Sequence, residues 1–526
     1  MVADVYDVIV AGAGHNALTT AAYLARSGMK VLVLERLGWI GGGVVTRELT
    51  APGFRDDTHS VAHGIIQANP MILQDEIGLL KDYGLRYIYP EASVATSFDD
   101  GSVIMTYFDL AKTCEGIAAF SEKDARAYAG LVQKMGQILP MFVQGMFSPP
   151  LPLGSLFALL EQSREGRELI GIMNRSAFDI IDDLFESDKV KIHLLQYVSQ
   201  NMVAPEDKGT GLVLCLMVGF AHHYQSGLPE GGSGALSDAL LRCIEDHGGT
   251  LLLNRDVEKI VVENGRAVGV VTRSGEDYRA SRAVVGCFHP HLLSTYIEGI
   301  DPALAAEARK TQPGSYSLLV VNCALREAPR FRGMENLPDP LIIECLPSNL
   351  THMRQEFDTL KYGNMPGHPS LAVAVHTNHD PARAPEGKAT LYMSTFAPYS
   401  LAEGKAWGDE KERVADWMLS ELRKYAENMG DENIIARAVA SPLDMETSSL
   451  SFQRGDIMGI GQYLYQFLGR RPVPELANYT IPGIEGFYLV GPFMHPGGGV
   501  TGGGRAVAIK MLADMNIDFE RAIAAR

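Results

Sequence analysis

The chain has 526 residues, 46% of them hydrophobic and 21% charged, which is an ordinary globular composition with enough apolar material for a sizeable core. Lys and Arg together number 46 against 63 Asp and Glu, and the net charge of −17 is not concentrated in a run of one sign. This diffuse acidic balance argues against a nucleic-acid partner and against electrostatic docking on anionic lipid.

The sequence also lacks the patterns of export, membrane insertion and metal binding. Asp4 and Asp7 stand where a secretory signal needs a basic segment, and no apolar run reaches the roughly 18 residues of a membrane span. The closest cysteines, Cys323 and Cys345, are 22 positions apart, which excludes a CxxC-type pair. We therefore expect a cytoplasmic protein with reduced thiols and no bound metal.

The first predicted elements are a strand, a helix and a second strand. Residues 5–11 form an apolar run, residues 15–28 carry alanine and leucine at helical spacing, and residues 30–34 form another apolar run. The connections are tight. This order predicts a βαβ unit and hence a parallel sheet.

The turn after the first strand, GAGHNA at residues 12–17, fits the pattern G-x-G-x-x-A. Gly12 would allow the tight turn, Gly14 would let a pyrophosphate approach the backbone, and Ala17 is small enough for the helix to pack on the sheet. Glu35 ends the second strand, 21 residues after Gly14, where an acid accepts hydrogen bonds from ribose hydroxyls. The pattern predicts a dinucleotide site; the alternative is a glycine turn in an ordinary α/β sheet.

A second glycine loop, GGG at residues 41–43, follows the acid closely. NAD does not need such a loop, whereas the longer FAD could contact it along its pyrophosphate and ribityl chain. The competing interpretation is a flexible turn.

The next stretch, residues 106–227, is predicted to be mainly helical. It contains a proline-rich apolar patch at residues 139–160. This patch has two interpretations: a substrate entrance or membrane-resting lip, and a core helix broken by a proline turn.

Residues 228–287 form a second ordered block. We predict a helix over 234–246, a strand over 250–253, a hairpin closed by Asn264-Gly265 and a strand over 282–287. The stretch 288–480 then mixes strands at 316–325 and 370–377 with a helix at 409–430.

The last block repeats the order strand, glycine loop, helix, at residues 486–491, 492–504 and 505–515. The positive end of that helix could point at flavin N1 and the C2 carbonyl, where negative charge collects on reduction. Together with the second glycine loop this favours FAD over NAD. No second nucleotide fingerprint for NAD(P) is visible.

These blocks predict an α/β architecture. A Rossmann-like FAD-binding domain would be built from residues 1–105, 228–287 and 481–526. Residues 106–227 and 288–480 would form an inserted α+β substrate-binding or cap domain.

Three stretches of the sequence resemble the phytoene dehydrogenase-like (carotenoid desaturase-like) FAD-dependent oxidoreductases, at residues 8–48, 224–260 and 486–512. Within that family the chain is similar to the pyridine nucleotide-disulfide oxidoreductase domain 2 type. The resemblance runs from end to end and implies a two-domain fold of the monoamine oxidase and phytoene desaturase type. It also implies that the cofactor-binding residues are Gly12, Gly14, His15, Asn16, Ala17, Glu35, Arg36, Gly42, Gly43, Val257, Gly491, Val500 and Thr501.

The chain departs from the family pattern at two positions. Ala17 stands where the family usually has glycine, which is a tolerable change. Pro492 stands where many FAD proteins place an aspartate that binds the ribityl–phosphate region, so that hydrogen bond must be supplied otherwise or be absent.

The resemblance implies a dehydrogenase or desaturase that transfers hydride from a C–H bond of a mainly apolar, alicyclic or isoprenoid-like substrate to flavin N5. Oxygen or a quinone would accept the electrons. Peripheral membrane contact and the oligomeric state stay open. The candidate proton-handling residues are His59, His495 and Tyr224. His59 and His63 form HxxxH without a third ligand, so no metal is expected.

Three other functions share this fold and stay open. A flavin amine oxidase is one, although the loop Phe493-Met494-His495-Pro496 lacks the Tyr or Trp that often guides the amine. A redox-neutral flavin isomerase is another. The third is a prenyl-protein escort factor without flavin, which the intact glycine loops and Glu35 disfavour.

Overall fold

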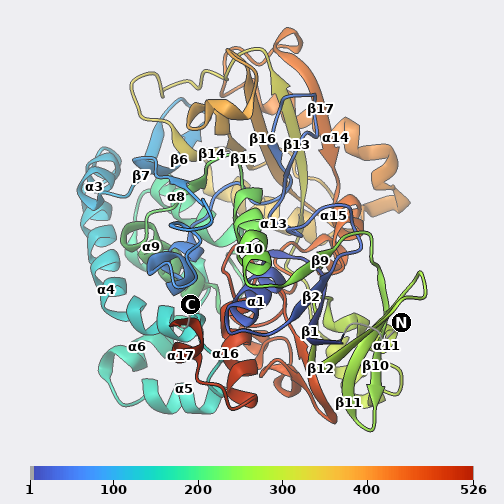
Figure 1. Ribbon diagram of the computed structural model, residues 1–526. Helices are drawn as coiled ribbons and strands as arrows, with labels where there is room; N and C mark the ends of the chain where they lie inside the picture. The colour runs from blue at the N-terminus through green and yellow to red at the C-terminus, as the bar shows by residue number, and fades with distance from the viewer. Residues whose placement is uncertain (1–4, 525–526) are drawn as a thin grey trace.

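The computed structural model describes residues 5–524, so the predicted feature at Asp4 lies outside the described residues. Two β-sheets and a layer of helices make up the molecule (Figure 1). The first sheet lies beside the chain termini, and the second sheet lies on the opposite side of the molecule.

The first sheet has the strand order β10-β11-β19-β12-β1-β2-β9, with β18 paired to β19. Its centre is parallel: β1 lies between β2 and β12, β9 follows β2, and β19 follows β12. The parallel strands are mostly apolar and buried because helices cover them. The strands are β1 Val5–Ala11, β2 Val31–Leu34, β9 Thr250–Leu252, β10 Val257–Glu263, β11 Arg266–Thr272, β12 Asp277–Gly286, β18 Thr480–Ile481 and β19 Ile484–Leu489.

Helices α1 His15–Arg26, α10 Gly234–Asp246 and α16 Gly504–Asp514 pack beside one another on this sheet (Figure 1). The Thr20 hydroxyl donates a hydrogen bond to the Gly504 carbonyl at 2.9 Å, which ties α1 to α16. Residues from the start, the middle and the end of the sequence therefore share one hydrophobic core. This arrangement confirms the predicted Rossmann-like assembly.

The second sheet has the order β17-β13-β16-β15-β14-β6-β7 and is antiparallel except for β14–β6. One face packs on α14 Trp407–Leu422, and the other faces the helical layer. Its strands are β6 Ala92–Phe98, β7 Val103–Tyr107, β13 Ser317–Leu325, β14 Pro340–Leu346, β15 Leu371–Ala374, β16 Ala389–Ala397 and β17 Ile434–Ala440.

The helical layer comes mostly from residues 110–223, as predicted. The proline turn predicted within residues 139–160 does not break a helix, because α4 Glu122–Met146 runs through Pro140. Buried Leu139 and Phe142 anchor this part of α4 in the core, and tertiary packing outweighs the lost backbone hydrogen bond. The other helices of the layer are α3 Leu110–Ala118, α5 Leu153–Leu160, α6 Arg164–Met173, α7 Ala177–Leu184, α8 Asp188–Ser199 and α9 Thr210–His223.

Several boundaries differ from those predicted. Strands β6 and β7 join the second sheet, although the first domain was expected to extend to residue 105. The predicted helix 409–430 ends at Leu422, and the predicted strand 370–377 ends at Ala374 and continues as a 3-10 turn. The remaining short elements are β3 Thr46–Arg47, β4 Asp56–Asp57, β5 Tyr87–Ile88, β8 Leu228–Pro229, α2 Pro70–Leu73, α11 Leu293–Tyr296, α12 Pro302–Ala308, α13 Leu350–Lys361, α15 Pro442–Ser448 and α17 Phe519–Ala524.

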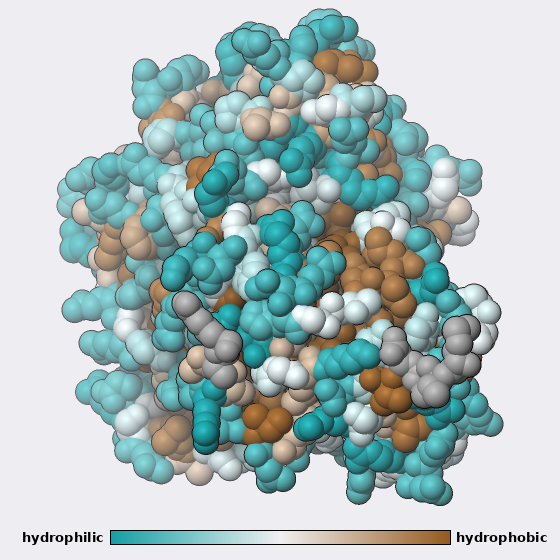
Figure 2. Space-filling model, viewed as in Figure 1, coloured by the Kyte–Doolittle hydropathy of each residue, from teal (hydrophilic) through white to brown (hydrophobic). Residues whose placement is uncertain are grey.

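The surface seen in the orientation of Figure 1 is mostly hydrophilic. Hydrophobic residues gather right of centre, over the region where Figure 1 places β9 and α15 (Figure 2). Among residues 5–524, no helix is long and apolar enough to cross a bilayer.

Candidate active site

A cavity of about 310 Å³ is lined by residues from both sheets. One part, the glycine-loop half, is lined by residues of the first sheet and its loops. The other part, the sheet half, is lined by residues of the second sheet and the segments that face it. The residues of the sheet half are Val61, Ala62, Gln200, Met202, Leu318, Ile342, Ala372, Val373, Ala374, Tyr392, Ser394, Ile457 and Met458.

The two N-terminal glycine loops lie against each other in the glycine-loop half. Gly14 and Gly41 form a parallel bridge, in which the Gly41 N–H donates to the Ala13 carbonyl at 2.8 Å. A Cβ added at Gly42 would lie 3.1 Å from the Gly14 Cα. Glycine is therefore needed for the close approach of the two loops, and their backbones form one wall of the cavity.

Gly12 makes the turn from β1 into α1. Its φ of +114° favours glycine, and an added Cβ would lie 2.9 Å from the Cys287 Cβ at the end of β12. The turn thus keeps the first and third strands of the site in contact, as the motif predicts.

The helices α1 and α16 both begin beside this half, and neither has a side-chain cap. Buried polar atoms without a hydrogen-bond partner lie nearby: His15 Nε2, Asn16 Oδ1 and Thr501 Oγ1. Such atoms cost free energy unless a ligand bonds to them. Unpaired N–H groups at a helix start suit a pyrophosphate or a polarised flavin edge, so these residues fit FAD.

Glu35 lines the same half and is nearly buried. Its Oε2 accepts a hydrogen bond from the Ala13 N–H at 2.8 Å, and its Oε1 accepts one from the Leu37 N–H at 2.9 Å. Burial raises the pKa of Glu35, and these two hydrogen bonds oppose the rise. The carboxylate is held at the cavity wall, where ribose hydroxyls could reach it.

The other predicted cofactor residues divide into two groups. Arg36 also lines the cavity, while its guanidinium donates to the carbonyls of Thr447 and Ser448. Ala17 and Thr501 are not part of the cavity lining, because Ala17 is packed in the core and Thr501 lies behind it. The predicted residues that line the cavity are Gly12, Gly14, His15, Asn16, Glu35, Arg36, Gly42, Gly43, Val257, Gly491 and Val500.

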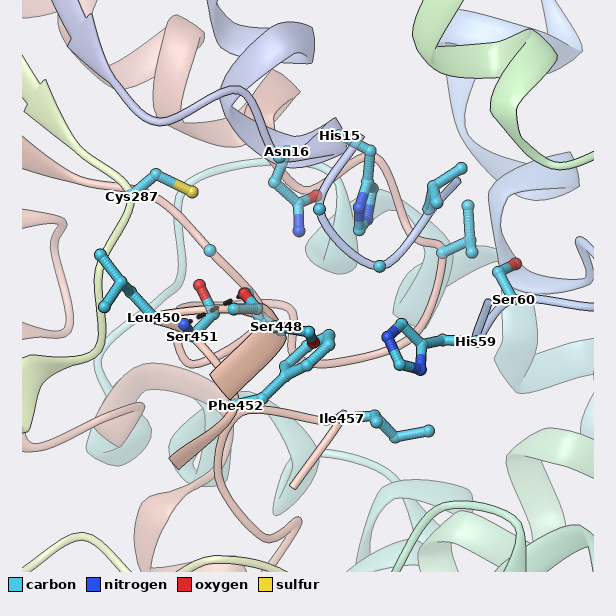
Figure 3. A pocket seen from close by; sticks show the side chains of 18 of the residues that line it. His15, Asn16, His59, Ser60, Cys287, Ser448, Leu450, Ser451, Phe452 and Ile457 are labelled. Atoms are coloured by element: carbon cyan, nitrogen blue, oxygen red, sulfur yellow. Dashed lines mark hydrogen bonds between the residues drawn. The ribbon is translucent and has the colours of Figure 1, made fainter. Parts of the chain in front are cut away.

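His59 is the one predicted proton-handling residue that the structure places in the cavity lining. Its ring packs edge-on against Phe452 at 5.4 Å, and the two rings face each other across the pocket floor in Figure 3. Its Nδ1 has no hydrogen-bond partner. Burial lowers the pKa of His59 to about 4, so the imidazole is neutral at pH 7.

His495 and Tyr224 lie elsewhere. The His495 ring is buried, and its Nε2 pairs with the Gly145 carbonyl at 2.9 Å, so it fastens the C-terminal glycine loop to α4. Tyr224 follows the end of α9 and packs on Phe220. Neither side chain lines the cavity, so neither is positioned to exchange a proton with a molecule inside it.

Asp57 belongs to a buried ion pair that joins the two halves of the protein. Its Oδ2 lies 2.8 Å from Arg383 Nη2, and both side chains are fully buried. Its Oδ1 accepts from the Thr46 hydroxyl and from the Ser233 N–H. His376 lies 3.8 Å from the carboxylate. This cluster fixes the start of the segment that carries His59 into the cavity.

The segment 448–458 supplies lining residues that the sequence analysis did not identify. Ser448, Leu450, Ser451, Phe452 and Ile457 surround the cavity opposite His15 and Asn16 (Figure 3). Their sequence has no glycine motif and no periodicity. A Cβ at Gly43 would lie 3.0 Å from the Phe452 ring, a contact between distant segments that only the fold creates.

Comparison with known proteins gives a family and a fold. Residues 122–503 match the family described as flavin containing amine oxidoreductase, and residues 7–89 match that described as FAD dependent oxidoreductase. The pyridine nucleotide-disulfide oxidoreductase domain-containing protein 2 of Rattus norvegicus is 29% identical, over 97% of this chain and 94% of its own. One of the limonene dehydrogenase subunits of Castellaniella defragrans is 28% identical, over 98% and 95%.

Phytoene desaturases are among the more distant matches, which confirms the resemblance drawn from the sequence. Among solved structures, a putrescine oxidase bound to putrescine superposes with a TM-score of 0.61 at 16% identity, over 97% of this chain and 99% of its own. That likeness concerns the fold alone, and it confirms the expected two-domain architecture.

Proposed function

Since the chain belongs to the flavin containing amine oxidoreductase family, in which FAD is the cofactor, we propose that it dehydrogenates a mainly apolar, alicyclic or isoprenoid-like substrate. The observation that carries this proposal is the single cavity. Its glycine-loop half suits the dinucleotide, and its sheet half is lined mainly by aliphatic side chains. A substrate in the sheet half would therefore lie next to the flavin end of the cofactor.

When bound, FAD supplies the hydride acceptor at N5, and oxygen or a quinone would reoxidise it. The substrate loses one hydride and, from the neighbouring atom, one proton, so that a double bond forms. Neutral His59, with Nδ1 free in the cavity, would accept the proton. The aliphatic lining would exclude water and orient the C–H bond.

An amine substrate is the second candidate, because the family name includes amine oxidases. The lining of the sheet half disfavours it. None of the described residues of that half carries a carboxylate that could pair with an ammonium group. A charged amine would lose its hydration there without compensation.

The test is the visible spectrum of the purified protein, followed by anaerobic titration with limonene, carvone and simple primary amines. We expect a flavin spectrum that bleaches with a terpene or a cyclic ketone. Bleaching by amines alone would support the amine oxidase, and isomerised product without bleaching would support an isomerase. A protein that takes up no FAD when it is supplied would contradict the proposal.

A paired variant ties the cofactor to the cavity. Gly14→Val fills the glycine-loop half, while its Cβ would lie an ordinary 3.5 Å from Cys287 Sγ, so the fold should persist. We expect the variant to lose bound FAD with an unchanged far-UV spectrum. Gly130→Val, on α4 with no atom near its added Cβ, serves as the control and should keep the flavin.

A further inference from the structure

One face of the second sheet forms the floor of the sheet half. Ile342, Ala372, Ser394 and Leu318 line the cavity from β14, β15, β16 and β13. Directly paired residues share a face of a sheet, and Glu344 pairs with Ala372, which pairs with Ser394. The carboxyl of Glu344 therefore belongs to the same face as the cavity lining.

Gln200 connects that carboxyl to the cavity. It follows the last residue of α8, its side chain lines the sheet half, and its Nε2 donates a hydrogen bond to Glu344 Oε1 at 3.0 Å. The second N–H of the Gln200 amide and its carbonyl oxygen are left for a partner in the cavity.

Glu344 is an unusual residue to place there. It is 2% exposed, its Oε2 has no hydrogen-bond partner, and no described Lys, Arg or His pairs with it. Burial, with a contribution from nearby Glu356, raises the pKa of Glu344 to about 8, so the carboxyl is neutral at pH 7. Burying such a group costs free energy, which favours a role at the site.

The rest of the sheet half is nearly all apolar. Tyr392 and Ser394 are the other polar side chains in it, and they hydrogen-bond to each other. The amide of Gln200 is thus the polar group best placed to bind a ligand. An amide held by a neutral acid can bond a carbonyl or a hydroxyl, but it offers no countercharge to an ammonium.

We propose that Gln200, positioned by Glu344, determines substrate specificity by hydrogen-bonding a single uncharged oxygen on an otherwise apolar alicyclic substrate. Gln200 is the contacting residue, and Glu344 is a positioning residue. The assignment rests on the proposed function, which it refines from an apolar substrate to an oxygenated one. A hydrocarbon of the same shape would leave the buried amide unpaired and would bind more weakly.

The experiment uses the FAD-loaded full chain and three probes of one skeleton: limonene, carveol and carvone. Dissociation constants come from the flavin difference spectrum, from the concentration dependence of flavin reduction where a probe reacts, and from calorimetric titration. We expect carveol or carvone to bind at least about tenfold more tightly than limonene. Gln200→Leu should abolish this ratio and leave limonene binding unchanged.

Glu344 is tested by rescue. Glu344→Leu should abolish the ratio, because the amide loses its partner, whereas Glu344→Gln keeps a neutral hydrogen-bonding group and should retain the ratio. Gln133→Leu replaces an exposed glutamine on α4, outside the cavity, and should behave like the unmodified protein. A purely structural role of Glu344 would affect limonene and carvone alike.

Equal affinities for limonene and carvone in the unmodified protein, or an undiminished ratio in Gln200→Leu, would overturn the assignment. Its failure is separable from failure of the proposed function. A flavin that limonene reduces without any preference for the oxygenated probes contradicts the assignment alone. A protein that keeps the calorimetric preference but is reduced by none of the probes contradicts the dehydrogenase.

Discussion

His59 joins three properties that a proton acceptor in this cavity needs. It lines the cavity, its Nδ1 is unpartnered, and burial keeps the ring neutral by lowering its pKa to about 4. The same low pKa makes the imidazole a modest base. Its contribution therefore depends on proximity to the substrate as much as on basicity.

Replacing His59 should slow flavin reduction without releasing the cofactor. We expect His59→Gln to lower kcat by a factor on the order of 100 or more. A base works when unprotonated, so a pKa of about 4 predicts that kcat/KM is flat from pH 6 to 8 and falls only as pH approaches 4. Stopped-flow pH profiles of both proteins measure this. An acid limb near pH 6.5, or one unchanged in the variant, would assign the proton transfer elsewhere.

Sequence reasoning at this scale identified the residues that backbone geometry requires. Gly12 and Gly14 are needed for a turn and a close approach, and such needs leave a local pattern. Gln200 and Glu344 leave none, since one follows a helix, the other lies in a strand, and 144 positions separate them. Likewise, Phe452 contacts Gly43 only because the fold brings together segments with no sequence pattern of their own.

At the scale of elements, α1 and α16 cross more closely than ordinary side chains allow. A Cβ added at Gly504 would lie 2.0 Å from the Asn16 carbonyl oxygen and 2.8 Å from the Thr20 N–H nitrogen. Both contacts are to backbone, so the helices would have to move apart. These are the two helices whose uncapped starts lie beside the glycine-loop half.

Gly504→Ala should therefore destabilise the protein by about 1–3 kcal/mol and weaken FAD binding. Thermal unfolding and flavin release on dilution measure the two effects. The control is Gly116→Ala within α3, where an added Cβ meets no atom and alanine favours the helix. If Gly504→Ala matched that control in both assays, the close crossing would not matter for the site.

The elements themselves were predicted well where the signal is local. The helix 234–246 has the predicted bounds, and β1, α1 and β2 differ from the prediction by two residues or fewer. The second sheet was only partly visible, because β6 pairs in parallel with β14 some 250 positions away. Such a pairing follows from packing of the whole chain and not from the pattern of either strand.

For the whole molecule, the buried pair Asp57–Arg383 holds the segment beside the first sheet to a loop of the second. Asp57→Asn would leave the Arg383 charge buried without a counterion. We expect a loss of about 3–5 kcal/mol in the free energy of unfolding, measured by urea denaturation. Removing both charges, with Asp57→Asn and Arg383→Met, should recover part of that loss.

Asp431→Asn, at an ion pair whose carboxylate is 92% exposed, is the surface control and should unfold like the parent. Equal stability of Asp57→Asn and this control would mean that the buried pair does not join the halves. The flavin spectrum gives an independent reading, because loosening the segment at Asp57 should also shift the bands that sense His59 and Phe452.

The order of strands in the first sheet constrains how the protein is made. Strand β1 is synthesised first, yet its neighbour β12 ends at Gly286 and the next strand, β19, ends at Leu489. The nascent chain must keep its earliest apolar strand from aggregating until nearly all of the polypeptide has left the ribosome. Folding should consequently be slow, helped by chaperones and by free cofactor, and intolerant of premature termination before α16.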